Sequence, residues 1–234
     1  MFIKQTYESQ YLLLFDLDGT LLDTAKQIEF SMNQIRTDFG YETLMPAEYV
    51  RLIGQPVDQL LLDLNLSFDE KEQLINQFRK HLRTEITRNG VECFDGVVDT
   101  FYLLASLGIS VAVATTKPSE LAKHTINHSN LRQFNIHIQG TDNFSPKPSP
   151  VVINKILAEL NPMYALMVGD RIEDIEAASR AGINSIGIAA GAHKENALLS
   201  SGAKLAFPDF LGFSSFASSD PEGFRGYFSK LNLT

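Results

Sequence analysis

The stretch YLLLFDLDGT, residues 11–20, sets the fold that we expect for the whole chain. Its first half, residues 11–15, is wholly apolar, and a short run of this kind is typical of a strand buried on both faces of a parallel sheet. Asp16 and Asp18 follow the run. Because residues two apart in an extended segment point the same way, we expect both carboxylates to face one cavity. That arrangement costs free energy unless a cation neutralises them.

Residues 22–92 carry helical periodicity and no strand pattern. Their apolar residues recur at steps of three and four, which is typical of one face of a helix. The sets are Leu21, Ala25, Ile28, Met32, Ile35 and Phe39; then Val57, Leu60, Leu61 and Leu64; then Leu74, Phe78, Leu82 and Ile86. We therefore predict a small all-helical domain over 22–92, inserted into a core formed by 1–21 and 93–234.

Beyond Gly96 the pattern alternates between strands and helices. We expect strands at 109–114, 136–139, 165–168 and 184–189, and helices at 97–107, after 118, at 149–160 and at 172–181. Such alternation predicts an α/β fold in which a doubly wound parallel sheet is covered by helices on both faces. Ligands bind such sheets beyond the carboxyl ends of the strands, so the polar residues there are candidates for a site.

Polar groups suited to metal or phosphate follow the predicted strands. They are Asp16 and Asp18; Thr115, Thr116 and Lys117; Lys147 in SPKPSP; and Asp170 and Asp174 in GDRIED. Oxygen ligands favour Mg²⁺, backbone N–H groups ahead of a helix cradle anions, and a lysine offers phosphate a point charge. Each group alone also fits an ordinary turn, helix cap or solvated loop. Their occurrence together at successive strand ends is what favours a site.

Four of these groups, in their order along the chain, resemble the four signature motifs of the haloacid dehalogenase-like hydrolase superfamily. They are DxDGT (16–20), the strand-terminal Thr115, Lys147 with Pro148, and GDxxxD (169–174). The resemblance covers about residues 11–212. It implies a Rossmann-like core with a helical cap domain inserted after the first strand.

Three further segments, GQP (54–56), FDGV (94–97) and TKP (116–118), resemble the phosphoglycolate phosphatase-like branch of that superfamily. The chain departs from the branch at Thr116, where many relatives have Asn, a change that retains the backbone N–H donor. The Phe-rich segment after residue 212 has no counterpart in the motifs.

The resemblance implies a magnesium-dependent phosphomonoester hydrolase that works through an aspartyl-phosphate intermediate. Asp16 would be the nucleophile, and Asp18 would protonate the leaving oxygen and then deprotonate the attacking water. Lys147 would neutralise the nucleophile and the phosphate. Thr115, the backbone N–H of Thr116 and Lys147 would bind the phosphate oxygens.

The resemblance also implies a Mg²⁺ cofactor. Asp16, the backbone carbonyl of Asp18 and Asp170 would bind the ion, and Asp174 would order the metal site or its waters.

The expected substrate is a small phosphorylated metabolite such as 2-phosphoglycolate. Alternatives in the same superfamily are an inorganic pyrophosphatase and a sugar-phosphate phosphatase or mutase. A phosphoacceptor domain or a silent binding protein on this fold is the non-enzyme alternative. The first has no need of a leaving-group acid such as Asp18, and the second predicts the loss of a motif residue, whereas the motifs here are complete. Candidates for cap residues that set specificity are Lys26, Arg51 and the loop 54–56.

Composition narrows the remaining possibilities. The net charge is -8 and Lys/Arg runs are missing from the sequence, so we expect no nucleic-acid partner. Apolar runs long enough for a signal peptide or a membrane span are also missing, so we expect a cytoplasmic protein, a monomer or a homodimer, away from membranes. The single cysteine, Cys93, is interpreted as a core residue. The phenylalanines from Phe207 onward either pack on the core or form a self-association surface.

Overall fold

The computed structural model describes residues 9–45, 48, 53–61, 64, 66–190 and 193–231. Its centre is a six-stranded sheet with the order β5-β4-β1-β6-β7-β8, and every pairing in it is parallel. The strands are β1 (Tyr11–Phe15), β4 (Ser110–Ala114), β5 (His137–Gln139), β6 (Tyr164–Gly169), β7 (Asn184–Ile188) and β8 (Leu205–Phe207). The predicted α/β class with a parallel sheet is confirmed.

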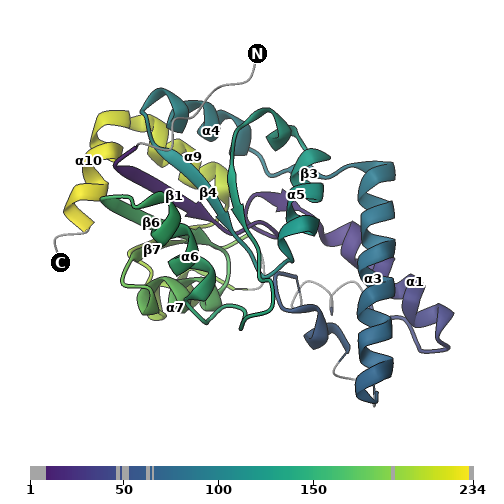
Figure 1. The fold of residues 1–234 in the computed structure, drawn as a ribbon. Helices are drawn as coiled ribbons and strands as arrows, with labels where there is room; N and C mark the ends of the chain where they lie inside the picture. Colours follow the sequence, from purple (N-terminus) through teal and green to yellow (C-terminus); the bar gives the residue numbers. More distant parts are fainter. Residues whose placement is uncertain are drawn as a thin grey trace.

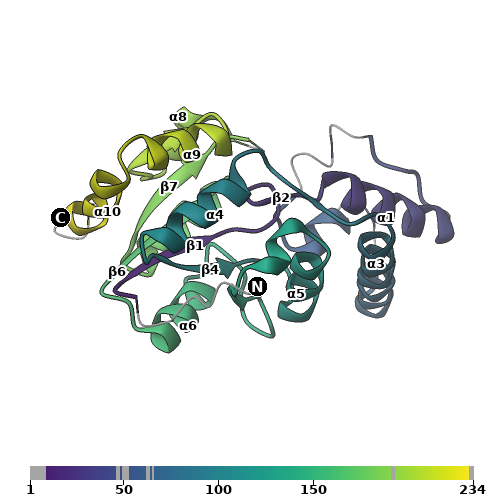
Figure 2. The ribbon, with the colours of Figure 1, turned by 90° about the horizontal axis from the view of Figure 1, so that it is seen from above.

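Helices cover both faces of the sheet, as the apolar run of β1 requires. In β1, Leu13 and Phe15 belong to the core on one face, and Leu12 and Leu14 to the core on the other. The first face is covered by α4 (Val97–Ser106), α9 (Phe210–Ser219) and α10 (Pro221–Leu231), and the second by α6 (Val151–Leu160) and α7 (Ile172–Arg180). Figure 2 shows α4 and α9 on one side of the strands and α6 on the other. The sheet is therefore doubly wound, as predicted.

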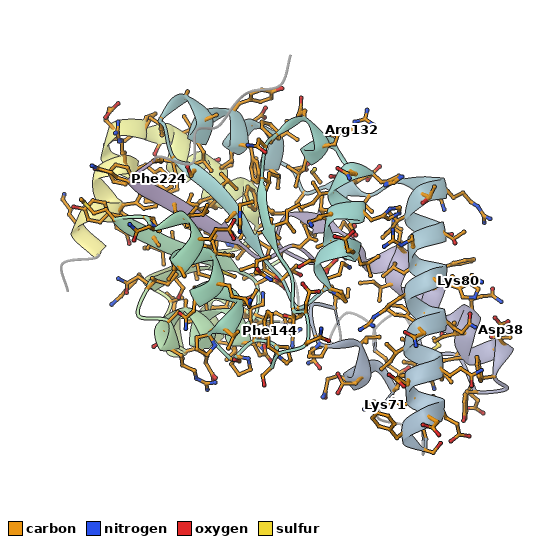
Figure 3. All side chains as sticks on the ribbon, viewed as in Figure 1. Asp38, Lys71, Lys80, Arg132, Phe144 and Phe224 are labelled. Atoms are coloured by element: carbon orange, nitrogen blue, oxygen red, sulfur yellow. The ribbon has the colours of Figure 1, made fainter. Side chains whose placement is uncertain are left out.

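The Phe-rich C-terminal segment completes the first face. Phe210, Phe213, Phe224 and Phe228 are buried, and the ring centroid of Phe15 lies 6.1 Å from that of Phe210. Figure 3 shows Phe224 among the side chains of the C-terminal helices. The interpretation that these rings pack on the core is confirmed. We did not predict β8 or α8 (Glu195–Ser200), two short elements that show no recognisable period in the sequence.

The helical insert leaves and rejoins the core through a short antiparallel ribbon. Its two strands are β2 (Leu22–Asp23) and β3 (Glu92–Cys93), and between them lie α1 (Ala25–Asp38), η1 (Val57–Leu61) and α3 (Phe68–Asn89). The prediction that 22–92 holds helices only is therefore wrong at both ends, since two-residue strands leave no pattern in the sequence. Figures 1 and 2 show α1 and α3 side by side, beyond the carboxyl ends of the sheet strands. The division into two domains at 21/22 and 92/93 stays a prediction.

The long helix α3 follows from its sequence. The Ser67 hydroxyl accepts a hydrogen bond from the Glu70 amide, and the Glu70 carboxylate accepts one from the Ser67 amide, which is a capping box. The predicted face of Leu74, Phe78, Leu82 and Ile86 is buried along its whole length. On α1 the predicted face ends one turn earlier than expected, because Phe39 lies past the helix and is 37% exposed.

The remaining helices connect these parts. The helix α5 (Ser119–Asn127) contacts both α3 and β5, so it joins the insert to the core, and the 3₁₀ helix η2 (Asn130–Gln133) follows it. Cys93 is half-buried and packs against the core, in agreement with its interpretation. Within the described residues, no helix is both long and apolar enough to span a bilayer.

Candidate active site

Three predicted metal ligands meet at the carboxyl ends of two neighbouring strands. Asp16 follows β1, Asp170 follows β6, and Asp174 lies in the first turn of α7. All three are buried, and each has a carboxylate oxygen within 4.8 Å of the others. The pairing of β1 with β6 brings Asp16 beside Asp170, although 154 positions of sequence separate them.

Two glycines make room for this triad of Asp16, Asp170 and Asp174. Gly19 has a φ of +87°, and a Cβ there would lie 2.8 Å from Oδ2 of Asp170. A Cβ on Gly169 would collide with the Asp174 carboxylate. The glycines of DxDGT and GDxxxD are therefore needed because two carboxylates approach the backbone closely.

Lys147 joins the triad from the loop before α6. Its buried ammonium donates to Oδ1 of Asp16 at 2.7 Å and to the carbonyl of Ala114 at 2.9 Å, and it lies 2.5 Å from Oδ1 of Asp174. Two of the three donors of the ammonium are thus used by Asp16 and Ala114, and its contact with Asp174 is an ion pair. The structure thus places Lys147 against the predicted nucleophile.

The electrostatics of the cluster favour a bound cation. Burial raises the pKa of Asp16 to about 7, even though the neighbouring Lys147 lowers it. Burial, with the charges of Asp16 and Asp174, also holds the pKa of Asp170 well above its usual range. Burial lowers the pKa of Lys147, but Asp16 and Asp174 outweigh burial and raise it. One ammonium does not balance three buried carboxylates, and this oxygen-only donor set fits a hard divalent cation.

Asp18 belongs to a second group beside the triad. Its Oδ1 accepts hydrogen bonds from the Lys117 ammonium at 3.0 Å and from the Thr24 hydroxyl at 2.7 Å, and all three side chains are buried. Asp18 lies close enough to Asp16 for its charge to help raise the pKa of Asp16, although the chain bends at Leu17 between them and is not extended there. The expectation that both carboxylates face one cavity stays a prediction. A metal contact of Asp18 is accordingly left to its backbone carbonyl, as the resemblance implies.

The two threonines after β4 have different partners. Thr115 is buried, and its hydroxyl oxygen accepts a hydrogen bond from the Lys117 amide at 3.2 Å. The Thr116 hydroxyl donates to the carbonyl of Gly54 at 2.8 Å. The Thr116 hydroxyl is thus bonded to the insert. The backbone N–H of Thr116 is the group predicted to bind phosphate.

A second bond holds the same loop of the insert. The buried Arg171 donates from Nη1 to the carbonyl of Ile53 at 2.8 Å, and a Cβ on Gly54 would lie 2.8 Å from Cδ of Arg171. The loop 53–56 is therefore fastened to the core at two points, one by Thr116 after β4 and one by Arg171 after β6.

A cavity of about 340 Å³ lies between the insert and the core. Asp18, Thr116 and Lys117 line it from the core, and the predicted specificity loop 54–56 lines it from the insert. The other candidates for cap residues are not placed there. Lys26 is exposed and lines a separate hollow on α1, and Arg51 lies outside the described residues.

Sequence reasoning missed three polar residues of this region, and it named Lys117 without foreseeing its contact with Asp18. Two of the three adjoin predicted motifs, namely Thr20 in DxDGT and Arg171 in GDRIED, and the Thr20 hydroxyl donates to Asp170 at 2.8 Å. Their place beside the motifs was a usable signal. Thr24 carried no such signal, because its contact with Asp18 depends on how the insert starts.

Known proteins are similar to this chain in sequence and in fold. A family model described as haloacid dehalogenase-like hydrolase matches residues 13–188. The chain is 36% identical over 174 residues to the phosphoglycolate phosphatase of Aquifex aeolicus (strain VF5), across 73% of this chain and 80% of that protein. It is 31% identical over 196 residues to the phosphoglycolate phosphatase of Aliivibrio fischeri (strain ATCC 700601 / ES114), across 79% and 86%. The crystal structure of a predicted phosphatase from Clostridium acetobutylicum shares the fold with a TM-score of 0.77 at 24% identity, across 90% of this chain and 99% of that one.

The chain therefore belongs to the haloacid dehalogenase-like hydrolase family. Within that family it lies in the phosphoglycolate phosphatase-like branch. The predictions of the superfamily, of the branch and of a phosphatase are thereby confirmed. The buried triad of Asp16, Asp170 and Asp174 agrees with the metal dependence of phosphatases in this family. The roles of single residues and the cytoplasmic location stay predictions.

Proposed function

We propose that this chain hydrolyses phosphomonoesters with Mg²⁺ as cofactor and with Asp16 as the nucleophile. The observation that carries the proposal is the buried carboxylate triad with Lys147 held against Asp16 at 2.7 Å. Phosphoryl transfer depends mainly on positioning and on neutralising charge, and this cluster supplies both at the end of the central strand.

In the first step a carboxylate oxygen of Asp16 forms a bond to phosphorus while the bond from phosphorus to the ester oxygen breaks. Asp18 gives its proton to the departing oxygen, so the alcohol leaves neutral. Lys147 stays beside Asp16 and offsets the repulsion between the carboxylate and the phosphate. The Thr115 hydroxyl and the Thr116 backbone N–H bind the other phosphate oxygens.

In the second step water attacks the phosphorus of the aspartyl-phosphate, and Asp18 takes the proton of that water. Inorganic phosphate leaves, and both aspartates return to their starting forms. Splitting the hydrolysis in this way replaces one difficult displacement with two easier ones.

Asp16, Asp170, Asp174 and the backbone carbonyl of Asp18 would hold the Mg²⁺ ion. When bound, the ion supplies positive charge that stabilises the transferring phosphoryl group. It also favours the ionised form of Asp16, whose pKa is raised to about 7 by burial. The ionised form is the one that can act as a nucleophile.

The substrate class is a small phosphorylated metabolite, and 2-phosphoglycolate is the reference substrate because the relatives described above bear its name. The loop 53–56 and α3 close over the site as a lid, which excludes water from the first step. We place the enzyme in the cytoplasm.

The test is release of inorganic phosphate from 2-phosphoglycolate, a hexose phosphate, an alkyl phosphate and pyrophosphate, with Mg²⁺ and with a chelator. We expect release from esters that the chelator stops. Asp16→Asn should abolish it while the circular dichroism spectrum stays unchanged. The matched control is Asp38→Asn, which makes the same chemical change at the exposed end of α1. If Asp16→Asn kept full activity, the assignment of Asp16 as the nucleophile would be refuted. If pyrophosphate were the only substrate that releases phosphate, the pyrophosphatase alternative would be favoured.

A further inference from the structure

We infer that the site is built for phosphomonoesters whose leaving group has an apolar body larger than glycolate. This inference rests on the proposed function and concerns the cavity of about 340 Å³ between the insert and the core.

The cavity lies on the leaving-group side of the site. Asp18, the proposed acid that meets the departing oxygen, is among its lining residues, and the nucleophile Asp16 is not. Thr116 and Lys117 line it next to Asp18. A phosphate held at Asp16 would therefore direct its ester oxygen past Asp18 and its organic group into this cavity.

The wall of the cavity is mainly apolar. From the insert it is formed by Ile28, Pro56, Val57, Ile75, Phe78 and Leu82, and from the core by Pro118, Leu121 and Pro146. Burying apolar surface against such a wall is favourable, whereas a hydroxyl or carboxylate there loses its hydration without gaining a partner.

The charged groups of the wall are poorly placed to hold a small anion. Lys117 is already paired with Asp18 at 3.0 Å. Asp58 faces Lys71 at 3.7 Å and would repel a carboxylate. Arg79 lines the cavity from α3 but is exposed, so solvent screens the charge that it presents there. The glycolate carboxylate, next to the ester oxygen, would lie beside the ion pair of Asp18 and Lys117.

The volume also exceeds what glycolate needs. At about 30 Å³ for each water-sized group, the cavity has room for about ten such groups. A two-carbon leaving group would leave most of it unfilled. An alkyl chain of moderate length or an aromatic ring would fill it and exclude water from Asp18.

The test is a series of n-alkyl phosphates from ethyl to hexyl, with 2-phosphoglycolate as reference, measured as kcat/KM in the presence of Mg²⁺. The basicity of the leaving alcohol hardly changes along this series, so the trend reports contact with the cavity. We expect kcat/KM to rise about two- to fourfold for each methylene until the cavity is filled. Hexyl phosphate should exceed 2-phosphoglycolate at least tenfold.

Ile75→Asn makes the half-buried wall of the cavity polar and should flatten this trend. The matched control is Leu199→Asn on the exposed face of α8, which should leave the trend unchanged. A flat series for the native chain, or 2-phosphoglycolate as the best substrate, would overturn the inference and leave the proposed function standing. Failure to release phosphate from every ester would refute the proposed function and, with it, the inference.

Discussion

Replacing Asp18 by asparagine separates the proposed acid and base from the structural role of the same side chain. Asp18 is only 4% exposed, and its Oδ1 accepts hydrogen bonds from Lys117 and Thr24. An asparagine oxygen can accept both bonds, so the local geometry should persist. The variant loses the carboxyl group that, when protonated, gives the leaving group its proton and, when ionised, balances the charge of Lys117.

The two losses differ in size. General acid–base catalysis contributes about 10²–10⁴-fold to rate, which raises the barrier by about 3–5 kcal/mol when it is removed. Replacing a buried charged hydrogen-bond acceptor by a neutral one that keeps the bond should cost about 1–3 kcal/mol of unfolding free energy. We therefore expect Asp18→Asn to fold, with a lower melting temperature, and to lose at least 100-fold in kcat on alkyl phosphates.

The assay combines steady-state phosphate release with a rapid acid quench and intact-mass measurement. With p-nitrophenyl phosphate the leaving group needs no proton, so the first step should survive and the aspartyl-phosphate should accumulate on Asp16. Asp38→Asn again serves as the control; Figure 3 shows Asp38 at the outer end of the insert. A kcat of Asp18→Asn within tenfold of the native value would refute the acid and base role.

Two further predictions follow from the contacts around the site. Thr116→Val removes one neutral hydrogen bond to the Gly54 carbonyl, which is worth about 1 kcal/mol. We therefore expect KM to rise about fivefold with little change in kcat. An unchanged KM would mean that this hydrogen bond does not hold the loop 53–56 over the site. Mg²⁺ should raise the melting temperature more at pH 8 than at pH 5.5. Burial raises the pKa of Asp16 from 3.8 to about 7, so in the metal-free protein its protonated form adds stability at low pH, and this is lost as pH rises through about 7. Above this pH, where Asp16 has lost its proton, a bound cation would neutralise the carboxylate and raise the free energy of unfolding again. Asp170→Asn should at least halve the effect of Mg²⁺ in a thermal scan, and a larger effect at pH 5.5 would contradict the argument.

Much of the fold was predictable because its signals are local. The apolar run before Asp16 and the alternation beyond Gly96 indicated a buried parallel sheet, since a strand covered on both faces has no polar side to show. The helical period of α3 was equally clear, and all of its predicted apolar face is buried. The two-residue strands of the ribbon and the three-residue β8 stayed hidden; β5 is as short as β8, but it was predicted because it takes its place in the alternation beyond Gly96.

The candidate site was predictable as a set of residues, and its arrangement was not. The order of DxDGT, Thr115, Lys147 and GDxxxD determined the family, because these residue types follow successive strands of one sheet. The sequence also determined that carboxylates and a lysine would gather, since parallel strands bring their carboxyl ends to one edge.

Only the tertiary structure decided which lysine forms an ion pair with which aspartate. It pairs Lys147 with Asp16 and Asp174, and it pairs Lys117 with Asp18. Neither choice could be read from spacing, because it depends on the bend at Leu17 and on how two distant loops pack above β1. The cavity beside Asp18 is likewise a tertiary property, since the insert and the core both contribute to its wall. Residue types determine the chemistry available to this chain, whereas the packing of the insert on the sheet determines what can reach it.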